Sequence, residues 1–259
     1  MGIILERMRQ GHRTMAYPDG PAPDLPARWL GWPVLDSSTP VDSLDVGFCP
    51  SGALSGEGGK LHLDVGRCIF CGACAGRGVT FSREFAMGRF SRDDLRLGGA
   101  PARVSADGAR LAEIRSLFGR SLKLREVSAG GCNACEADCN VLGTLAWDMG
   151  RFGLGFVASP RHADGILVTG PVTDNMKLAL EKTYRAVPAP KVVIAVGACA
   201  VSGGVYGDAS AVAVAGGLDS VVPVDLHIPG CPPHPLVILE GLLRFLGRIP
   251  DLQAAHGGE

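Results

Sequence analysis

The segment PKVVIAVGACAVSGGVYG, residues 190–207, says most about the fold class. It opens with an apolar run, Val192–Val196, and then passes through a glycine turn to Cys199. A short, continuous apolar run bounded by turn residues is typical of a strand that is buried on both faces of a sheet. The stretch therefore predicts a buried parallel strand with a thiol at its carboxyl end.

The same alternation of short apolar runs and helix-length segments continues on both sides of this stretch. Further strands are predicted at Leu122–Val127, Leu154–Ala158, Ile166–Thr169 and Val221–Leu226, and helices at Ala109–Phe118, Asn133–Met149, Thr173–Val187 and Pro235–Leu246. Strands that alternate with helices predict an α/β fold, in which helices cover both faces of a parallel sheet. Binding sites in such sheets form at the carboxyl ends of the strands.

Several cysteines of this region lie at predicted strand ends, beside glycine or proline: Cys132, Cys135, Cys199 and Cys231. The first two follow Gly130-Gly131 at a strand-to-helix turn, where glycine lets the backbone approach a bulky ligand. The free amides and positive potential of a helix amino terminus favour an anionic thiolate cluster. We therefore expect these cysteines to converge and to bind a four-iron cluster.

Other residues near these motifs have two interpretations each. Glu136 is either a second-layer or proton-handling carboxylate beside the cluster or an exposed acid at a helix start. Arg161 and His162 either belong to the surroundings of the cluster or bind local backbone. Cys139, one helical turn beyond Cys135, could rival a ligand, but we expect a small buried residue.

Residues 39–90 hold a second group of cysteines among many glycines. Cys68, Cys71 and Cys74 have the Cys-x2-Cys-x2-Cys spacing of a bacterial ferredoxin loop, which holds a four-iron cubane. The few strand-like pieces cannot form a core by themselves, so this stretch implies a metal staple. A zinc knuckle or unrelated thiols are the alternatives, because Cys-x2-Cys also suits a tetrahedral metal site.

The fourth ligand is expected upstream, at Cys49-Pro50. Positions 39, 42, 45 and 49 repeat the spacing of positions 68, 71, 74 and 78, as the two halves of a two-cluster ferredoxin do. In the crossed ligation of that repeat, one set is Cys49, Cys68, Cys71 and Cys74, and the other is Thr39, Asp42, Asp45 and Gly78. Because the first set is complete and the second has lost every cysteine, we predict one retained and one deleted cluster.

Composition excludes several classes of protein. Of the 259 residues, 46% are hydrophobic, so most of the chain can form a core. The 25 Lys and Arg nearly balance the 26 Asp and Glu, which argues against a nucleic-acid partner. The odd number of cysteines, nine, argues against a disulfide scaffold. We expect no signal peptide and no transmembrane segment, and we expect reduced thiols.

Together these motifs indicate a known family. Residues 120–248 resemble the small, electron-transfer subunit of group 4 energy-converting nickel–iron hydrogenases and formate hydrogenlyases, which is homologous to the 20 kDa subunit of complex I. The segments that carry the resemblance are GGCNACEAD, FVASPRHADGILVTGPVTDNM, PKVVIAVGACAVSGGVYG and PVDLHIPGCPPHP. The Cys-x2-Cys of the first segment is similar to the hydrogenase branch, since the complex I branch has adjacent cysteines there.

Residues 11–75 resemble the separate two-cluster ferredoxin subunit of the same complexes. The matching text is GHRTMAYPDGPAPDLPARWLGWPVLD, FCPSGAL and CIFCGAC. The resemblances imply a flavodoxin-like parallel-sheet domain that follows a small, ferredoxin-like α+β domain. The expected parts are an extended, proline-rich arm at 1–38, in which Trp29 and Trp32 are buried, the ferredoxin-like domain at 39–90, a connector with a helix at 91–120, and the α/β domain at 121–249.

The function implied by the resemblance is electron transfer within an oxidoreductase complex. Electrons would pass between two 4Fe–4S clusters and a large catalytic subunit that holds a nickel–iron centre, so no catalytic residue is expected in this chain. Membrane-arm subunits and further ferredoxin-type or dehydrogenase subunits are the other expected partners, on the cytoplasmic side of the membrane. The alternatives are a quinone-reducing, complex I-like subunit, a related complex without nickel, and a structural protein that a metal staples together.

Overall fold

The computed structural model describes residues 2–11, 13–36, 46–99, 108–207 and 213–252. Thr39, Asp42 and Asp45, which belong to the predicted deleted cluster, lie outside these ranges. Gly78 lies inside them, and its backbone has a φ of 77°.

A parallel sheet of five strands forms the centre of the molecule, as the sequence predicts. Its strands are β6 (Leu122–Ser128), β7 (Leu154–Phe156), β8 (Gly165–Thr169), β9 (Val192–Val196) and β10 (Leu226–Ile228). Their order across the sheet is β10-β9-β8-β6-β7. Numbered along the chain from β6, this is the 2-1-3-4-5 order of flavodoxin-like sheets. The order reverses between β6 and β8, and such a switch point is where these sheets form their binding crevice.

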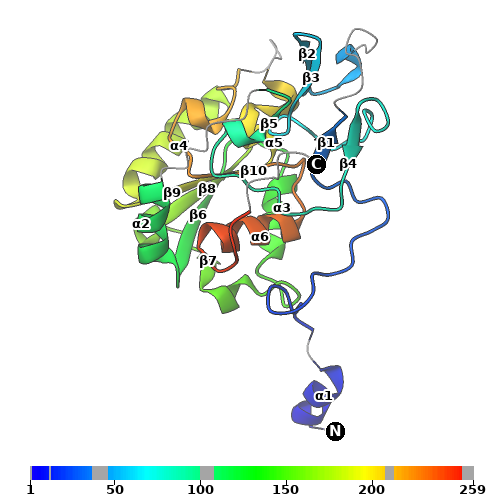
Figure 1. Cartoon of the computed structure of the whole chain (residues 1–259). Helices are drawn as coiled ribbons and strands as arrows, with labels where there is room; N and C mark the ends of the chain where they lie inside the picture. Colours follow the sequence, from blue (N-terminus) through cyan, green and yellow to red (C-terminus); the bar gives the residue numbers. More distant parts are fainter. Residues whose placement is uncertain (1, 12, 37–45, 100–107, 208–212, 253–259) are drawn as a thin grey trace.

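Helices cover both faces of the sheet (Figure 1). One face packs against α2 (Gly108–Phe118), α3 (Ala134–Val141) and α6 (Pro235–Phe245), and the other against α4 (Asp174–Ala186) and α5 (Ala198–Ser202). Neighbouring strand residues alternate between the two buried clusters, because successive side chains point to opposite faces. Leu167 and Ile194 thus join the α6 side, whereas Val168 and Ala195 join the α5 side.

Two predicted elements differ from the structure by more than two residues, and the others agree to within two. The fifth strand was expected at Val221–Leu226 but occupies Leu226–Ile228. Pro223 precludes a ladder hydrogen bond there, and Asp225 begins the pairing instead, because its carboxylate accepts the Val193 amide at 2.9 Å. The helix expected at Asn133–Met149 ends at Val141, since the chain turns at Gly143, whose amide donates to the Asn140 carbonyl.

Two small antiparallel sheets form the amino-terminal region. In the first, β1 (Pro33–Leu35) pairs with β4 (Val79–Phe81). In the second, β3 (Lys60–Asp64) lies between β2 (Leu54–Glu57) and β5 (Arg96–Leu97). The two sheets therefore combine residues of the expected arm, of the segment 39–90 and of the connector.

Short 3₁₀ turns complete the described chain. They are η2 (Val46–Phe48), η3 (Asp93–Leu95), η4 (Met149–Phe152), η5 (Pro160–His162), η6 (Gly204–Tyr206) and η7 (Leu218–Ser220).

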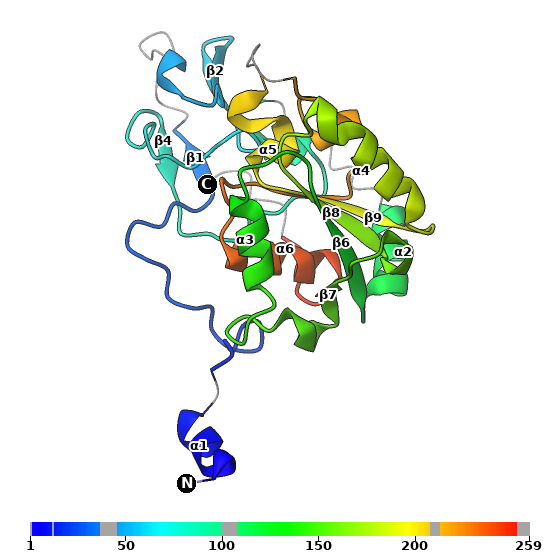
Figure 2. The ribbon, with the colours of Figure 1, turned by 180° about the vertical axis from the view of Figure 1, so that it is seen from behind.

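The amino-terminal arm reaches the start of α6, where the Trp29 ring lies 5.4 Å from the ring of His234. Its first helix, α1 (Ile3–Gln10), projects away from the body (Figures 1 and 2) and has no buried residue. Further along, Trp29 and Trp32 pack against the core on the α6 side, so the predicted burial of these tryptophans is borne out in part. Every residue of α6 is buried, a pattern that occurs when a helix is covered on all sides.

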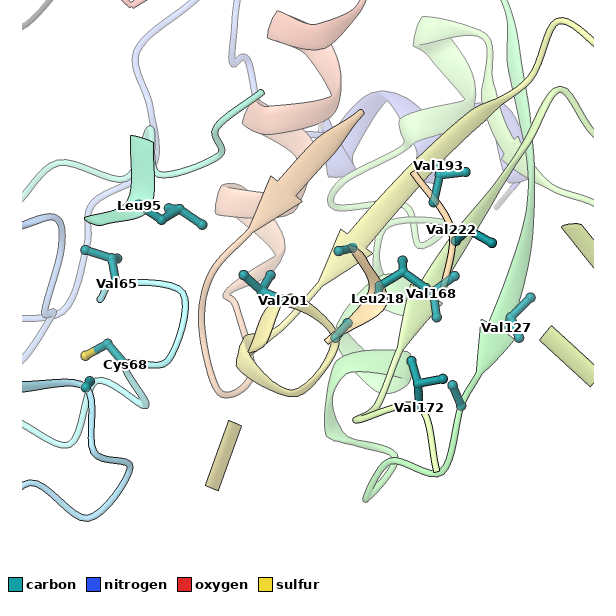
Figure 3. Close-up of a cluster of buried hydrophobic side chains, with 14 of the residues drawn as sticks. Val65, Cys68, Leu95, Val127, Val168, Val172, Val193, Val201, Leu218 and Val222 are labelled. Atoms are coloured by element: carbon teal, nitrogen blue, oxygen red, sulfur yellow. The ribbon is translucent and has the colours of Figure 1, made fainter. Parts of the chain in front are cut away.

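One continuous core joins the amino-terminal region to the central sheet. Val65, Cys68 and Leu95 belong to the same buried cluster as Val201 of α5 and Val168 of β8, as Figure 3 shows. The backbone of residue 89 also pairs with residue 227 of the edge strand β10. The two parts therefore share a core and pack as one body.

Candidate functional site

The cysteines of the α/β part gather at the carboxyl edge of the sheet. Cys132 follows β6, Cys135 lies in the first turn of α3, Cys199 begins α5 after β9, and Cys231 follows β10. Cys132 and Cys231 are exposed, and the other two are half-buried. The structure thus brings together all four residues that the sequence predicts for this site.

Two glycines, because they have no side chain, leave room for the thiols of Cys135 and Cys199. A Cβ atom built on Gly197, whose φ is +91°, would come within 2.5 Å of the Cys135 Sγ. A Cβ on Gly204, whose φ is +56°, would lie 3.1 Å from the Cys199 Sγ. Any larger residue at position 197 would therefore collide with a thiol of the site, besides adopting a backbone conformation that side chains disfavour.

Electrostatic coupling shows how close the thiols are to one another. Burial raises the pKa of Cys135, and the neighbouring Cys199, Cys231 and Cys132 raise it further. Burial raises the pKa of Cys199 to about 11, with additional contributions from Cys231 and Cys132, and the pKa of Cys231 is raised by burial and by Cys132. Four thiolates in this arrangement repel one another, so the site favours a cationic centre that binds them together.

Glu136 supports the turn that carries this site. Its Oε1 accepts hydrogen bonds from the hydroxyls of Ser128, at 2.6 Å, and Thr169, at 2.7 Å. Burial by itself raises the pKa of Glu136, but these two hydrogen bonds hold it below its ordinary value. The same Oε1 lies 3.3 Å from the position of a Cβ on Gly131. The carboxylate therefore joins β6, β8 and the glycine turn before Cys132.

The remaining residues singled out in the sequence lie elsewhere. Arg161 and His162 precede β8, so the structure places them at the amino edge of the parallel sheet, beside Leu117 and Pro188. The structure does not bring them to the thiols, because those lie at the carboxyl edge. Cys139 is fully buried in the apolar core on the α6 side.

The cysteines of the amino-terminal region line one small, apolar cavity. Its walls combine Cys49, Cys68, Cys71 and Cys74 with apolar side chains, including Leu54, Leu63, Ile69 and Phe81. Burial, together with the neighbouring Cys74, Cys49 and Cys71, raises the pKa of Cys68 to about 12. The structure therefore brings together this second predicted set, from two segments on either side of β2 and β3.

Backbone amides point at two of these sulfurs. The amide of Phe70 donates to the Cys68 Sγ at 3.4 Å. Burial raises the pKa of Cys49, but hydrogen bonds from the Leu54 backbone and from Ser51 lower it below its ordinary value. Donors aimed at sulfur stabilise the thiolate form, which is the form that binds metal.

Sequence reasoning missed the polar partners of these sites. Ser128, Thr169 and Ser202 carry no motif of their own, and their roles depend on side chains that are far away in the chain. A hydroxyl beside a strand end is too common a feature to single out before the strands are placed.

The fold and site define a flavodoxin-like α/β protein with four convergent thiols at the carboxyl edge of its parallel sheet. The family model described as NADH ubiquinone oxidoreductase, 20 Kd subunit, matches residues 132–245, which span these thiols. A probable membrane-bound hydrogenase subunit of Pyrococcus furiosus is 40% identical over 143 residues, which are 55% of this chain and 84% of that protein. The chain belongs to the family of this 20 kDa subunit and is an oxidoreductase subunit.

Two further relatives come from different branches of the family. Formate hydrogenlyase subunit 7 of Escherichia coli K12 is 38% identical over 162 residues, which are 61% of this chain and 63% of that protein. An NADH-quinone oxidoreductase subunit of Citrifermentans bemidjiense is 42% identical over 127 residues, which are 49% of this chain and 73% of that protein. In the described part of the chain, no helix has the length and apolar character that crossing a membrane requires.

Proposed function

We propose that this chain is the electron-transfer subunit of a membrane-associated, respiratory-type oxidoreductase complex and that it holds two 4Fe–4S clusters. The observation that carries the proposal is the presence of two separate four-thiol sets in one body. One set is Cys132, Cys135, Cys199 and Cys231, and the other is Cys49, Cys68, Cys71 and Cys74. Iron–sulfur binding is typical of the family, and the residues present at both sites suit it.

A single zinc ion and a cubane cluster need different spacings of their four thiolates. Zn–S bonds of about 2.3 Å place the sulfurs of a tetrahedral zinc site roughly 3.8 Å apart. Within the described ranges, no three or more His, Cys, Asp or Glu side chains are placed to hold one metal ion. In a cubane each thiolate binds a different iron, so the sulfurs lie further apart.

A bound cubane cluster supplies a one-electron redox couple. The chain's own residues hold and tune it. The Phe70 amide and Ser51 donate toward sulfur in the amino-terminal set, and the apolar cavity there limits the access of water. Such hydrogen bonds and burial set the potential at which a thiolate-bound cluster changes charge.

The amino-terminal region is proposed as a ferredoxin-like unit at residues 39–90 that retains one cluster and has lost another. Gly78 stands where a ferredoxin repeat places a ligand, and its carbonyl accepts the Asp36 amide instead. With residues 1–38, 91–120 and 121–249, this unit completes the proposed domain organisation.

The proposed partner is a large catalytic subunit that covers the carboxyl edge of the sheet. Cys132 and Cys231 are exposed there, although cluster ligands are better protected from solvent. The relatives from hydrogenase and formate hydrogenlyase systems favour a nickel–iron partner. The relative from an NADH-quinone oxidoreductase favours a quinone-reducing partner as the second candidate. We place the chain peripherally, on the cytoplasmic side, beside membrane-arm subunits.

The first test is the metal content of the whole chain purified without oxygen. Two cubane clusters correspond to about eight irons per chain, with visible absorption and, after reduction, a spin-resonance signal. About four irons would leave one set unoccupied and overturn the two-cluster proposal. Zinc without visible absorption would favour the structural, metal-stapled protein.

The second test separates the two sets. Cys49→Ser is expected to remove only the amino-terminal cluster, about four irons, and to increase proteolysis within residues 46–99, because cluster binding contributes to folding there. Cys231→Ser, the matched variant, is expected to remove only the other cluster. Unchanged iron content and proteolysis in Cys49→Ser would contradict the crossed ligation scheme.

A further inference from the structure

One contact links the two cysteine sets. The Ser202 hydroxyl, at the end of α5, lies 3.0 Å from the Gly66 carbonyl oxygen and 3.0 Å from the Ala198 carbonyl oxygen. The same hydroxyl accepts the Gly204 amide at 3.2 Å. Ser202 is three residues after Cys199, and Gly66 is two residues before Cys68. The contact therefore lies between one ligand of each proposed cluster.

On the side of the α/β part, Ser202 fixes the turn that covers Cys199. The Gly204 amide that donates to this hydroxyl belongs to the residue whose Cβ position lies 3.1 Å from the Cys199 Sγ. Gly203, with a φ of +82°, connects Ser202 to Gly204. Without the hydroxyl, the Gly204 amide in the turn over the Cys199 thiol loses its side-chain acceptor.

On the amino-terminal side, the turn from Asp64 to Cys68 is held at several points. The Asp64 carboxylate accepts the Gly66 amide at 2.9 Å and both terminal nitrogens of Arg92, at 2.8 and 2.6 Å. The Cys68 amide donates to the Val65 carbonyl at 3.2 Å. A displacement of Gly66 is therefore transmitted to Cys68.

The turn that contains Gly66 packs against α5 with no space for an added side-chain atom. A Cβ on Gly66 would lie 2.7 Å from the Val201 Cγ1 and 2.8 Å from the Arg92 Cζ. Val201 is only 2% exposed and belongs to the same core cluster as Val65 and Cys68 (Figure 3). Because Val is stiff at χ1, it cannot move aside as a long side chain would.

We propose that Ser202 and Gly66 are positioning residues that fix the separation of the two cysteine sets, so that electrons pass directly between the groups they hold. The inference rests on the proposed function. Each transfer oxidises one centre and reduces the other by one electron, and no bond forms or breaks. Electron tunnelling weakens steeply with distance. The contact between the Gly66 turn and α5 has no room for an added methyl group, so it keeps the separation of the two groups, and the rate of electron transfer between them, fixed.

The experiment compares Gly66→Ala and Ser202→Ala in the full chain, purified without oxygen. Ser220→Ala is the matched serine control. The Ser220 hydroxyl also bonds two carbonyls, but it takes no part in the contact between Ser202 and Gly66. Gly143→Ala is the glycine control, since its Cβ would find only an ordinary contact at 3.5 Å. The measurements are iron per chain, the magnetic interaction between the two reduced centres, the rate of electron equilibration between them, and amide hydrogen exchange at Gly204.

In Gly66→Ala and Ser202→Ala, we expect wild-type iron content, a weaker magnetic interaction and several-fold slower equilibration. Gly204 exchange should be faster in Ser202→Ala, and both controls should behave as wild type. Unchanged coupling and rate in both variants would overturn the inference, even if Gly204 exchange changes. Loss of iron in both variants would also overturn it, since the contact would then hold the ligand turns. A wild-type chain without iron would instead defeat the proposed function itself, and this inference with it.

Discussion

At the scale of single residues, Cys139 differs from Cys135 in its surroundings. Cys139 is fully buried in the apolar cluster that also contains Leu142 and Ile238, whereas Cys135 is coupled to Cys199, Cys231 and Cys132. Cys139→Ser is expected to leave the iron content unchanged and to lower the free energy of unfolding by about 1–3 kcal/mol, the cost of burying a hydroxyl. Iron analysis and chemical denaturation check both effects, and loss of one cluster would make Cys139 a ligand.

Tyr17 gives the arm a dependence on pH. Burial and, to a smaller extent, the charge of Glu240 raise its pKa to about 12. The folded protein therefore keeps the phenolic proton to a higher pH than the unfolded chain. The stabilisation is complete below pH 10, the ordinary pKa, and is lost as the pH rises toward 12.

We expect the protection of residues 13–36 from hydrogen exchange, measured relative to the intrinsic exchange rate at each pH, to fall over this interval in the wild type. Tyr17→Phe should abolish that change, because its ring keeps the edge contact with Phe85 without an ionisable group. If hydrogen exchange in residues 13–36 were the same in the wild type and in Tyr17→Phe at every pH, ionisation of Tyr17 would not be the cause of the pH dependence.

At the scale of elements, the turn between β9 and α5 shapes the carboxyl-edge site. Gly197→Ala would place a methyl group 2.5 Å from the Cys135 Sγ, at a φ of +91°. We expect it to lose the carboxyl-edge cluster, about four irons, and to keep the amino-terminal one. Gly155→Ala is the control, because its nearest neighbour is the flexible end of Lys123 at 3.3 Å. Full iron content in Gly197→Ala would show that the thiols do not bind where the structure places them.

At the scale of the whole molecule, a buried ion pair joins α6 to the amino-terminal region. Arg244 and Glu240 are each 3% exposed, and the Arg244 guanidinium donates both to Glu240, at 2.8 Å, and to the Gly88 carbonyl, at 3.1 Å. Arg244→Leu leaves the carboxylate buried without its partner and is expected to cost about 3–5 kcal/mol. Removing both charges, in Glu240→Leu with Arg244→Leu, should cost less. Urea unfolding of the two variants distinguishes these outcomes, and equal losses would contradict the argument.

Much of the fold was predictable from local patterns. The apolar runs of β6, β8 and β9 and the periodicity of α4 and α6 agree with the structure to within a residue or two. These elements are buried continuously or on one face, so hydrophobic spacing alone marks them. Val221–Val224 misled the same reasoning, because an apolar composition does not reveal that Pro223 and the Asp225 carboxylate set the start of β10.

Local sequence patterns were enough to place the thiols along the chain and to predict that strands end beside them. The spacing of the cysteines also predicted that Cys49 joins Cys68, Cys71 and Cys74, which lie beyond β2 and β3 in the chain. These four cysteines line one cavity. The packing of distant elements added that Trp29 of the arm meets His234 at the start of α6, that Ser128 and Thr169 hold Glu136, that Arg161 and His162 lie away from the thiols, and that Ser202 meets Gly66. The physical reason is that spacing encodes neighbours along a strand or helix, whereas a contact such as the last one, across 136 residues, depends on how separate elements pack.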